Sequence, residues 1–405
     1  MNLCYICREY PPAPRMGGIA SATRDQARSL ARRGHRVHVL APAWEAAGSF
    51  DDEGVLVHRL RSPGWQLPGA SRLIGQSLDR LGWSRAAARA VSRLHRLERL
   101  DLVEAPEFAA EGLLAARRAA PPVVVRLHTP LALVRRLNGT PLRRDCRLTV
   151  HWERAALQAA AAVSAPSAAI AHACAEAGYG PAAAAARIIP YGVDTSLFCP
   201  DGGVAACAAT AAGPLVLFPG RLEARKGVGD FASALPAIAA QVPEARFAFV
   251  GADTQTAPGG GSWQQQLIAH ARAAGIEGRV QFAGFLPREQ LPSWYRAAST
   301  VVAPSPFENL ALVFLEALAC GRPLVGCSSG AFPEAVSDGS EGRTVAPCSP
   351  QALAGAVVDL LRDPAAAAAM GRRGRQLALR RFSLERVAAL TEEFYGEVIA
   401  TWRSR

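Results

Sequence analysis

Short apolar runs alternate with longer amphipathic stretches along most of this chain. The apolar runs hold four to six residues rich in Val, Leu, Ile and Phe, as strands buried on both faces do. This alternation predicts an α/β protein with parallel sheets. The predicted strands span 3–7, 37–40, 55–60, 102–105, 123–127, 215–218, 246–250, 280–283, 300–303, 323–326 and 342–345, and the predicted helices span 19–33, 86–99, 109–118, 309–321, 351–361, 364–381 and 384–402.

The length of the chain favours two domains. A chain of 405 residues exceeds what one hydrophobic core usually supports, so two domains of about 200 residues each are expected. The Gly- and Ala-rich run 201–213 is typical of an interdomain linker. We therefore predict an N-terminal Rossmann-like domain over 1–200, a linker over 201–213 and a C-terminal Rossmann-like domain over 214–383.

One predicted helix carries a single charged residue in an otherwise apolar run. Between Asn309 and Gly321 the exception is Glu316, a carboxylate that is costly to bury unless a partner satisfies it. A second carboxylate, Glu308, comes just before the helix, and Asn309 is a suitable N-cap. Eight residues separate the two acids by roughly 12 Å, with the free amides at the start of the helix between them. This arrangement predicts a site for a nucleotide diphosphate sugar.

The acid pair and the residues after it resemble a known family. The spacing Glu308-x7-Glu316, followed by ALACGRP over 317–323, resembles the signature of retaining glycosyltransferases of family four. The resemblance implies the GT-B fold, in which two Rossmann-like domains face across a cleft and a last helix, here 384–405, crosses back to the first domain. It implies that Glu308 contacts the transferred sugar and Glu316 the ribose. The amides of Asn309, Leu310 and Ala311 complete this part of the donor site.

Two further segments carry the same resemblance. The sequence GRLEARKG over 220–227 is similar to the family's GR-x4-KG segment, so Arg221 and Lys226 are expected to bind the donor diphosphate. Lys226 is the only lysine in the chain. Two cations suit this leaving group because negative charge grows on it as the glycosidic bond breaks. Phe285 and Leu286 match the segment whose backbone meets the base, and they do not distinguish UDP, GDP and ADP.

The N-terminal half offers a glycine pair and a histidine. Gly17 and Gly18 follow the first strand, where their backbone can approach a ligand closely at the carboxyl edge of the sheet. His128 ends the strand 123–127 at the same edge. The resemblance places the glycines near the donor phosphates and His128 beside the transferred sugar. A simple turn and a strand-end hydrogen-bonding role remain the structural alternatives.

The positive charge lies entirely in the first half. Residues 1–190 contain 26 Arg against 15 Asp and Glu, whereas residues 191–405 contain equal numbers of each sign. Such a field favours an anionic partner, and we expect peripheral contact with the inner face of a membrane. A solvated arginine-rich surface is equally consistent with it. Nine cysteines without regular spacing, and no secretory leader, favour a reducing cytoplasm.

These features predict a retaining glycosyltransferase acting on a glycan, lipid-linked or small-molecule acceptor in polysaccharide or glycolipid biosynthesis. Its predicted catalytic residues are Glu308, His128, Arg221 and Lys226. No Asp-x-Asp pair is present to hold a cation on the diphosphate, so neither a metal nor another cofactor is predicted. A sugar phosphorylase or nucleotide-sugar epimerase on the same scaffold remains possible on fold alone, as does a nucleic-acid-binding protein that uses the basic half, although no nucleic acid is expected.

Overall fold

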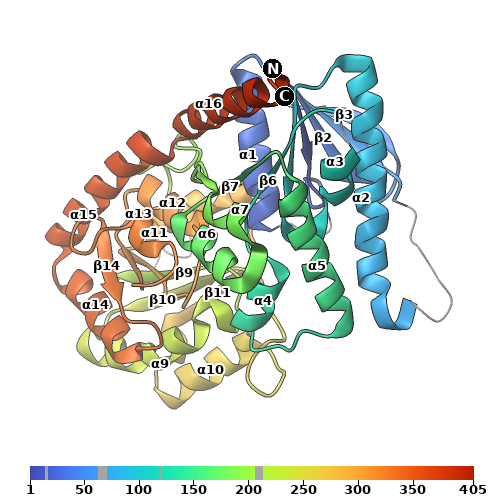
Figure 1. Ribbon diagram of the computed structural model, residues 1–405. Coiled ribbons are helices and arrows are strands. Elements are labelled where there is room, and N and C mark those ends of the chain that lie inside the picture. The colour runs from blue at the N-terminus through green and yellow to red at the C-terminus, as the bar shows by residue number, and fades with distance from the viewer. Residues whose placement is uncertain (14–16, 63–70, 119, 206–212) are drawn as a thin grey trace. The chain divides into compact units, whose positions relative to one another are not determined.

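The computed structural model divides the chain into two compact α/β units (Figure 1). Unit 1 comprises Met1–Gly192 with Leu384–Arg405, and unit 2 comprises Val193–Ser383. All residues are described except 14–16, 63–70, 119 and 206–212. The chain enters unit 2 at Val193, earlier than the boundary expected at residue 200, because Val193 already pairs with Ser383. Of the predicted linker, residues 206–212 lie outside the described part.

Unit 1 is built on a sheet of eight strands in the order β3-β4-β2-β1-β5-β6-β7-β8, with β3 antiparallel to β4 and the other pairs parallel. The strands are β1 Asn2–Ile6, β2 Arg36–Pro42, β3 Gly48–Asp52, β4 Val55–Leu60, β5 Leu102–Pro106, β6 Val123–Arg126, β7 Ala162–Ala165 and β8 Arg187–Ile188. The helices are α1 Gly18–Arg32, α2 Ser71–Glu98, α3 Leu113–Arg118, α4 Leu131–Leu137, α5 Arg144–Ala159, α6 Ala168–Cys174, α7 Pro181–Ala184 and α16 Leu384–Arg403.

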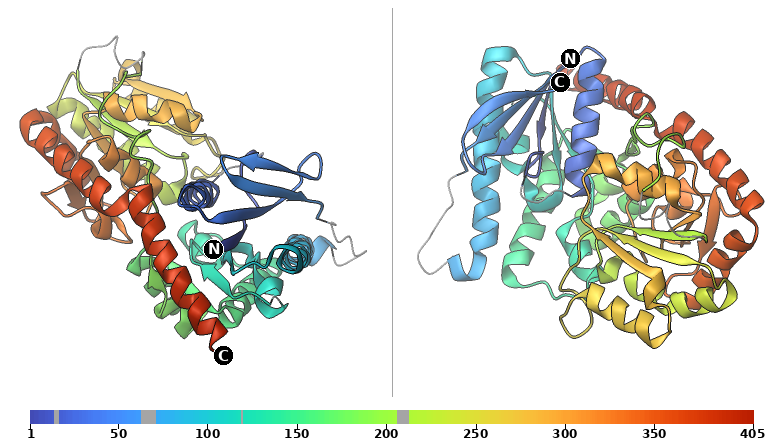
Figure 2. Two further views of the ribbon diagram at one scale, coloured as in Figure 1. Left: turned by 90° about the horizontal axis from the view of Figure 1, so that it is seen from above. Right: turned by 180° about the vertical axis from the view of Figure 1, so that it is seen from behind.

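Helices cover both faces of this sheet because side chains alternate along each strand. Leu3 and Tyr5 of β1 pack in one cluster with residues of α1 and α16, whereas Cys4 and Ile6 pack in another with residues of α2. Figure 2 shows α1 and α2 on either side of the strands. Cys7 lies in the first cluster and Cys4 in the second. The two thiols of this C-x-x-C sequence therefore point to opposite faces.

Unit 2 is built on a six-stranded parallel sheet in the order β11-β10-β9-β12-β13-β14. The strands are β9 Leu215–Pro219, β10 Arg246–Val250, β11 Val280–Gly284, β12 Thr300–Ala303, β13 Leu324–Cys327 and β14 Gly342–Val345. The helices are α9 Val228–Gln241, α10 Trp263–Ala273, α11 Leu291–Ala297, α12 Leu312–Ala319, α13 Phe332–Ala335, α14 Pro350–Arg362 and α15 Pro364–Leu377. The strand order reverses between β9 and β12, which is where ligands bind in doubly wound sheets.

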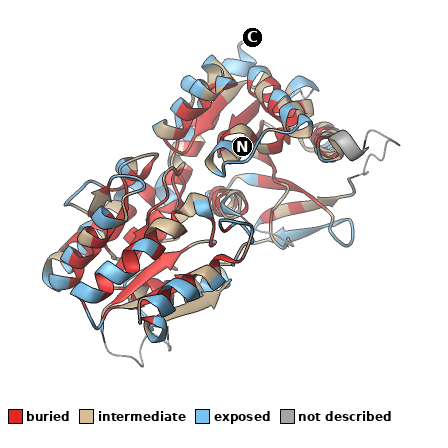
Figure 3. Cartoon of the chain, turned by 90° about the horizontal axis from the view of Figure 1, so that it is seen from below, coloured by how far each residue is buried: buried red, intermediate tan, exposed pale blue. Residues whose placement is uncertain are grey.

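Five interior strands are buried along their whole length, and buried residues fill the middle of both sheets (Figure 3). Every residue of β5, β6, β9, β12 and β13 is buried, which explains why each appears in the sequence as an apolar run. A strand of the structure lies at each position where the sequence predicted one, so these predictions are confirmed in both units. Among the described residues, no helix is long and apolar enough to cross a membrane.

Candidate functional site

Two loops of unit 2 meet where the strand order reverses. One follows β9 and contains residues 220–227, and the other follows β12 and contains residues 304–311. Gly227, at the end of the first loop, has a φ of 73°, and a Cβ placed on it would lie 2.2 Å from the carbonyl oxygen of Pro304. Only glycine allows this approach. The contact brings the side chain of Lys226 next to the loop that carries Glu308.

Lys226 and Glu308 form a partly buried ion pair at this position, in which the Glu308 side chain is 7% exposed and the Lys226 side chain 20% exposed. The Lys226 ammonium donates to Glu308 Oε1, and Ser305 Oγ donates to the same oxygen at 3.0 Å. Burial alone would raise the pKa of Glu308, but the charges of Lys226 and Arg225 outweigh it and hold that pKa below its usual value. The structure thus brings two predicted site residues together, with Glu308 ionised.

Another carboxylate, Glu223, lies in the loop that follows β9 and links two arginines. The sequence analysis did not include it among the predicted site residues. Glu223 is buried, and its two oxygens lie 2.6 Å from Arg221 Nη2 and 2.7 Å from Arg225 Nε. Arg225 also lies 4.0 Å from Glu308. Arg221 is therefore connected to the ion pair through Glu223 and Arg225. An acid placed among cations in GRLEARKG was the signal that could have identified this arrangement.

The helix predicted to begin at Asn309 begins three residues later. Helix α12 spans Leu312–Ala319, its N-cap is Ala311, and no side chain caps it. Leu310 has a φ of 118°, which a helix cannot accommodate. The expectation that Asn309 is the N-cap is therefore wrong. The amides of Asn309, Leu310 and Ala311 belong to the loop before the helix, and their role in donor binding stays a prediction.

Glu316 lies inside the core of unit 2 with a hydrogen-bonded partner. It is buried on α12, and its Oε2 accepts a hydrogen bond of 2.7 Å from the hydroxyl of Tyr295 on α11. Burial raises the pKa of Tyr295 far above its usual value, and the neighbouring Glu316 charge adds to this effect. The neutral phenol therefore satisfies one oxygen of the acid. The expected contact of Glu316 with a ribose stays a prediction.

The two residues expected near the base lie at the edge of the sheet. Phe285 and Leu286 follow β11, the outermost strand beside β10, and the Phe285 side chain is 64% exposed. A large exposed aromatic ring at the carboxyl end of a parallel strand is available for contact with a ligand.

His128 follows β6 in unit 1 and is held from two directions. Its backbone N–H donates to Glu107 Oε2 at 2.7 Å, and its ring Nδ1 shares a hydrogen bond with the Tyr191 hydroxyl. The two rings stack with centroids 5.7 Å apart. Burial, with the charge of Arg126, lowers the pKa of His128 to about 3. The imidazole is therefore neutral at physiological pH and suited to hydrogen bonding rather than to general-base catalysis.

The glycine pair at the start of α1 is exposed, as a ligand-facing turn requires. Gly17 is the N-cap residue of α1 and Gly18 its first residue. A Cβ on Gly17 would lie 3.0 Å from Glu9 Oε2, whereas one on Gly18 would meet nothing within 4 Å. Both belong to unit 1 with His128, and their predicted contact with donor phosphates is untested.

Two fully buried carboxyl groups, those of Glu107 and Glu153, lie close to each other near His128. Glu153 on α5 accepts hydrogen bonds from Ala109 N at 2.9 Å, Leu131 N at 3.2 Å and Tyr179 Oη at 2.6 Å. Burial raises the pKa of Glu153 to about 7, and it raises the pKa of Glu107 as well, with the nearby Glu153 adding to the effect. These groups are neutral in the folded protein under mildly acidic conditions.

Replacing Glu153 by glutamine should flatten the pH dependence of stability. The pKa of Glu153 is about 7 in the folded protein, above its ordinary value of 4.5. The contribution of protonated Glu153 to the free energy of unfolding is therefore fully present below pH 4.5 and is lost as the pH rises through 7. We expect the wild-type free energy of unfolding to fall by on the order of 2–3 kcal/mol more than that of Glu153→Gln between pH 4.5 and 8. Urea unfolding across this range measures the difference, and parallel curves would contradict the assignment.

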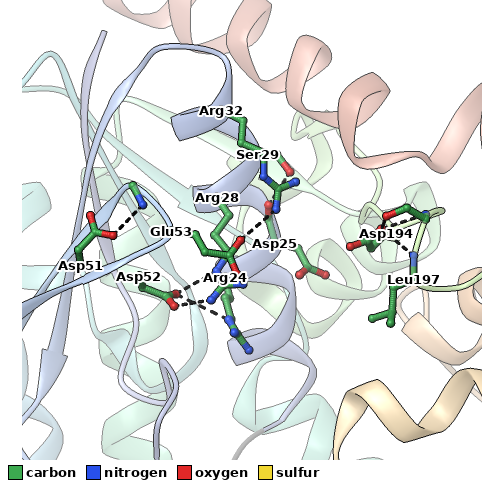
Figure 4. Close-up of polar contacts among 12 residues, drawn as sticks. Arg24, Asp25, Arg28, Ser29, Arg32, Asp51, Asp52, Glu53, Asp194 and Leu197 are labelled. Carbon is green, nitrogen blue, oxygen red and sulfur yellow. Dashed lines mark hydrogen bonds and ion pairs between the residues drawn. The ribbon is translucent and has the colours of Figure 1, made fainter.

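Part of the arginine excess serves the fold of unit 1. Asp52, at the end of β3, accepts hydrogen bonds from Arg28 Nε at 3.1 Å and from Tyr10 Oη at 2.7 Å, and it lies 3.7 Å from Arg24 Nε (Figure 4). Burial would raise the pKa of Asp52, but Arg28 and Tyr10 outweigh it and lower that pKa. These arginines anchor the edge hairpin to α1, so they are not free for an anionic partner.

Comparison with known proteins gives matches over nearly the whole chain. The family model described as "Glycosyltransferase Family 4" matches residues 16–197, and the model described as "Glycosyl transferases group 1" matches residues 209–377. A GDP-mannose-dependent alpha-(1-6)-phosphatidylinositol monomannoside mannosyltransferase of Mycolicibacterium smegmatis is 31% identical over 397 residues, which cover 92% of this chain and 93% of that protein.

Solved structures match with high coverage. Sucrose-phosphate synthase from Thermosynechococcus elongatus superposes with a TM-score of 0.80 at 23% identity and covers 99% of both chains. The Anabaena HepE protein, crystallised with UDP, gives a TM-score of 0.72 at 22% identity, covering 98% of this chain and 100% of that one. At these identities the similarity establishes a shared fold.

Proposed function

This chain belongs to glycosyltransferase family 4 and has the GT-B fold, as the sequence predicted, and we propose that it is a retaining hexosyltransferase. Its activity is the transfer of a sugar from a nucleotide diphosphate sugar to an acceptor. The observation that supports the residue assignments best is the group of charges at the strand-order reversal of unit 2, in which Lys226 and Glu308 form a partly buried ion pair beside Arg225.

In our proposal these cations bind the diphosphate of the donor. When the bond between the anomeric carbon and the diphosphate oxygen breaks, negative charge grows on the leaving group, and a preorganised ammonium and guanidinium stabilise it. Lys226, Arg225 and Arg221 provide these charges, so we expect activity to persist in excess EDTA. The departing phosphate oxygen accepts the proton of the acceptor hydroxyl, which balances the reaction without a protein base.

We assign Glu308 a binding role in this reaction. Its Oε1 already accepts from Lys226 and Ser305, which lowers its availability as a nucleophile. The carboxylate keeps Lys226 in place and can accept a hydroxyl of the transferred sugar through its other oxygen. His128, neutral at physiological pH, would act as a hydrogen-bonding partner of the same sugar.

The first donor and acceptor to test come from the mannosyltransferase relative. We propose GDP-mannose as the donor and a lipid-linked glycan as the acceptor class. Thermal unfolding with GDP-mannose, UDP-glucose and ADP-glucose identifies the base and sugar together, since a ligand of the folded state raises Tm. Proton NMR of the new glycosidic linkage then gives the anomeric configuration, and inversion would overturn the retaining assignment.

The paired arginines give a direct test of the diphosphate site. We expect Arg221→Gln and Arg225→Gln each to weaken binding of the preferred nucleoside diphosphate roughly tenfold, because each removes a charge-assisted hydrogen bond. Arg272→Gln is the matched control, since Arg272 pairs with Glu277 on the surface of α10. Isothermal titration calorimetry measures the three affinities, and equal values for all variants would remove the arginines from the site.

We also propose peripheral membrane contact through unit 1. Four exposed arginines around the start of α5 and the end of α4 form no ion pair with any residue that the structure describes: Arg136, Arg143, Arg144 and Arg147. Such a cluster is attracted to anionic lipid headgroups. Sedimentation with vesicles containing phosphatidylglycerol should retain the protein at low salt, and equal sedimentation with neutral vesicles would contradict this contact.

A further inference from the structure

Unit 2 contains a cavity at the edge of its sheet opposite the donor residues. The cavity has a volume of about 560 Å³, within the range of small-molecule pockets. Pro214, Ser299 and Pro323 line it, and each immediately precedes a strand, β9, β12 or β13 respectively. Lys226 and Glu308 follow the carboxyl ends of β9 and β12, and the other donor-site residues assigned in unit 2, apart from Glu316, likewise follow the carboxyl end of β9, β11 or β12. The cavity is therefore a separate site.

Three guanidinium groups line this cavity, and none of its lining residues is acidic. Arg375 is committed to the fold, because it donates to the carbonyls of Thr195, Phe198 and Ala319 at 2.9–3.0 Å. Arg322 and Arg372 form no ion pair with any residue in the described part of the chain. The cavity is thus a cationic pocket with two arginines available.

Arg322 is the more constrained of the two. It follows the end of α12 and is partly buried, and its Nε is shielded from solvent without a hydrogen-bond partner among the described residues. Burial lowers the pKa of its guanidinium, and nearby Arg296 adds to this effect. A buried donor without an acceptor is unfavourable, and an anion bound in the cavity would satisfy it.

The rest of the wall is apolar. Leu360, Leu361 and Ala367 are buried side chains from α14 and α15 that line the pocket, with Pro364 between them. An inorganic ion would leave this surface uncovered, whereas an organic molecule would bury it. We propose that this cavity binds a small phosphomonoester with an apolar body, whose phosphate is held by Arg322 and Arg372 and whose body packs on α14 and α15.

Phenyl phosphate is a suitable probe, with inorganic phosphate and phenol as its two halves. We expect calorimetry on the full chain to show one phenyl phosphate per chain, weaker binding of phosphate and no binding of phenol. Dihexanoyl phosphatidic acid, used as a monomer, tests whether the phosphomonoester that the pocket accepts can be a lipid. Binding of that lipid to the wild type, lost in Arg372→Gln, would assign the same pocket to lipid phosphates.

Variants decide whether the arginines hold the probe. Arg322→Gln and Arg372→Gln should each weaken phenyl phosphate at least tenfold, and Arg380→Gln, an exposed arginine outside the pocket, should not. Arg372 is exposed, so its variant remains informative if Arg322→Gln fails to fold. Saturating GDP, or the nucleoside diphosphate found to bind the donor site, should not displace the probe. Full displacement, unchanged affinity in Arg372→Gln, or no binding at all would overturn the proposal, whether or not the donor site is as assigned.

Discussion

Replacing Lys226 by alanine should lower kcat/KM for transfer by about 100- to 1000-fold. The expected loss is that of a single preorganised charge on a developing anion in a partly buried site. Lys226 is the only lysine in the chain and the closest cation to Glu308, so no described neighbour can take its place without moving. Initial rates at varied donor concentration separate an effect on donor binding from one on the chemical step.

A loss of activity in this variant must be separated from a loss of folding. Lys226→Ala removes the closest cation from the buried carboxylate of Glu308 and leaves it with Ser305 and, at 4.0 Å, Arg225. We expect this to cost up to about 3 kcal/mol of stability, the lower end of the range for buried pairs, because the ion pair is only partly buried. In the double variant Lys226→Ala/Glu308→Gln the charge is removed, so we expect most of this stability to return while activity stays low. Arg272→Ala should leave both properties unchanged. A folded Lys226→Ala protein with nearly wild-type kcat/KM would exclude this residue from catalysis.

The strands of this fold could be predicted because they are buried on both faces. The predicted strands 300–303 and 246–250 coincide with β12 and β10. Both are mostly apolar because a parallel strand between helices is covered on both faces. Strand β3 was not predicted because GSFDD is an exposed, antiparallel edge with no apolar run. Helix α2 begins at Ser71, earlier than the predicted residue 86, and glycines in its first half obscure the helical period.

At the candidate site the sequence predicted individual residues but not which of them contact one another. Glu308 and Lys226 were predicted through their motifs, and the structure shows that they form an ion pair. Their roles in donor binding and catalysis stay predictions. The position of Glu223 between two arginines depends on how the β9 loop folds, which residue identities do not reveal. The start of α12 was misplaced because the φ of Leu310 is set by its surroundings rather than by its own preference.

Gly227 allows the two loops that carry Lys226 and Glu308 to approach each other. It follows Lys226, has a left-handed backbone and lies against the carbonyl of Pro304, in the loop that leads to Glu308. An added Cβ would be 2.2 Å from that oxygen, so the two loops must separate. Any such movement pulls the ammonium of Lys226 away from its carboxylate partner.

We therefore expect Gly227→Ala to lower the free energy of unfolding by roughly 2–5 kcal/mol, combining the left-handed backbone penalty with the steric clash. The control is Gly278→Ala, because Gly278 has no positive φ and a Cβ added there would meet no atom within 4 Å, so its effect should stay below about 1 kcal/mol. Urea unfolding measures both free energies.

Because the loops separate, the folded fraction of Gly227→Ala should also bind the preferred nucleoside diphosphate more weakly. A purely conformational penalty would lower stability and leave that affinity unchanged. The second result would mean that the approach of the two loops does not shape the diphosphate site.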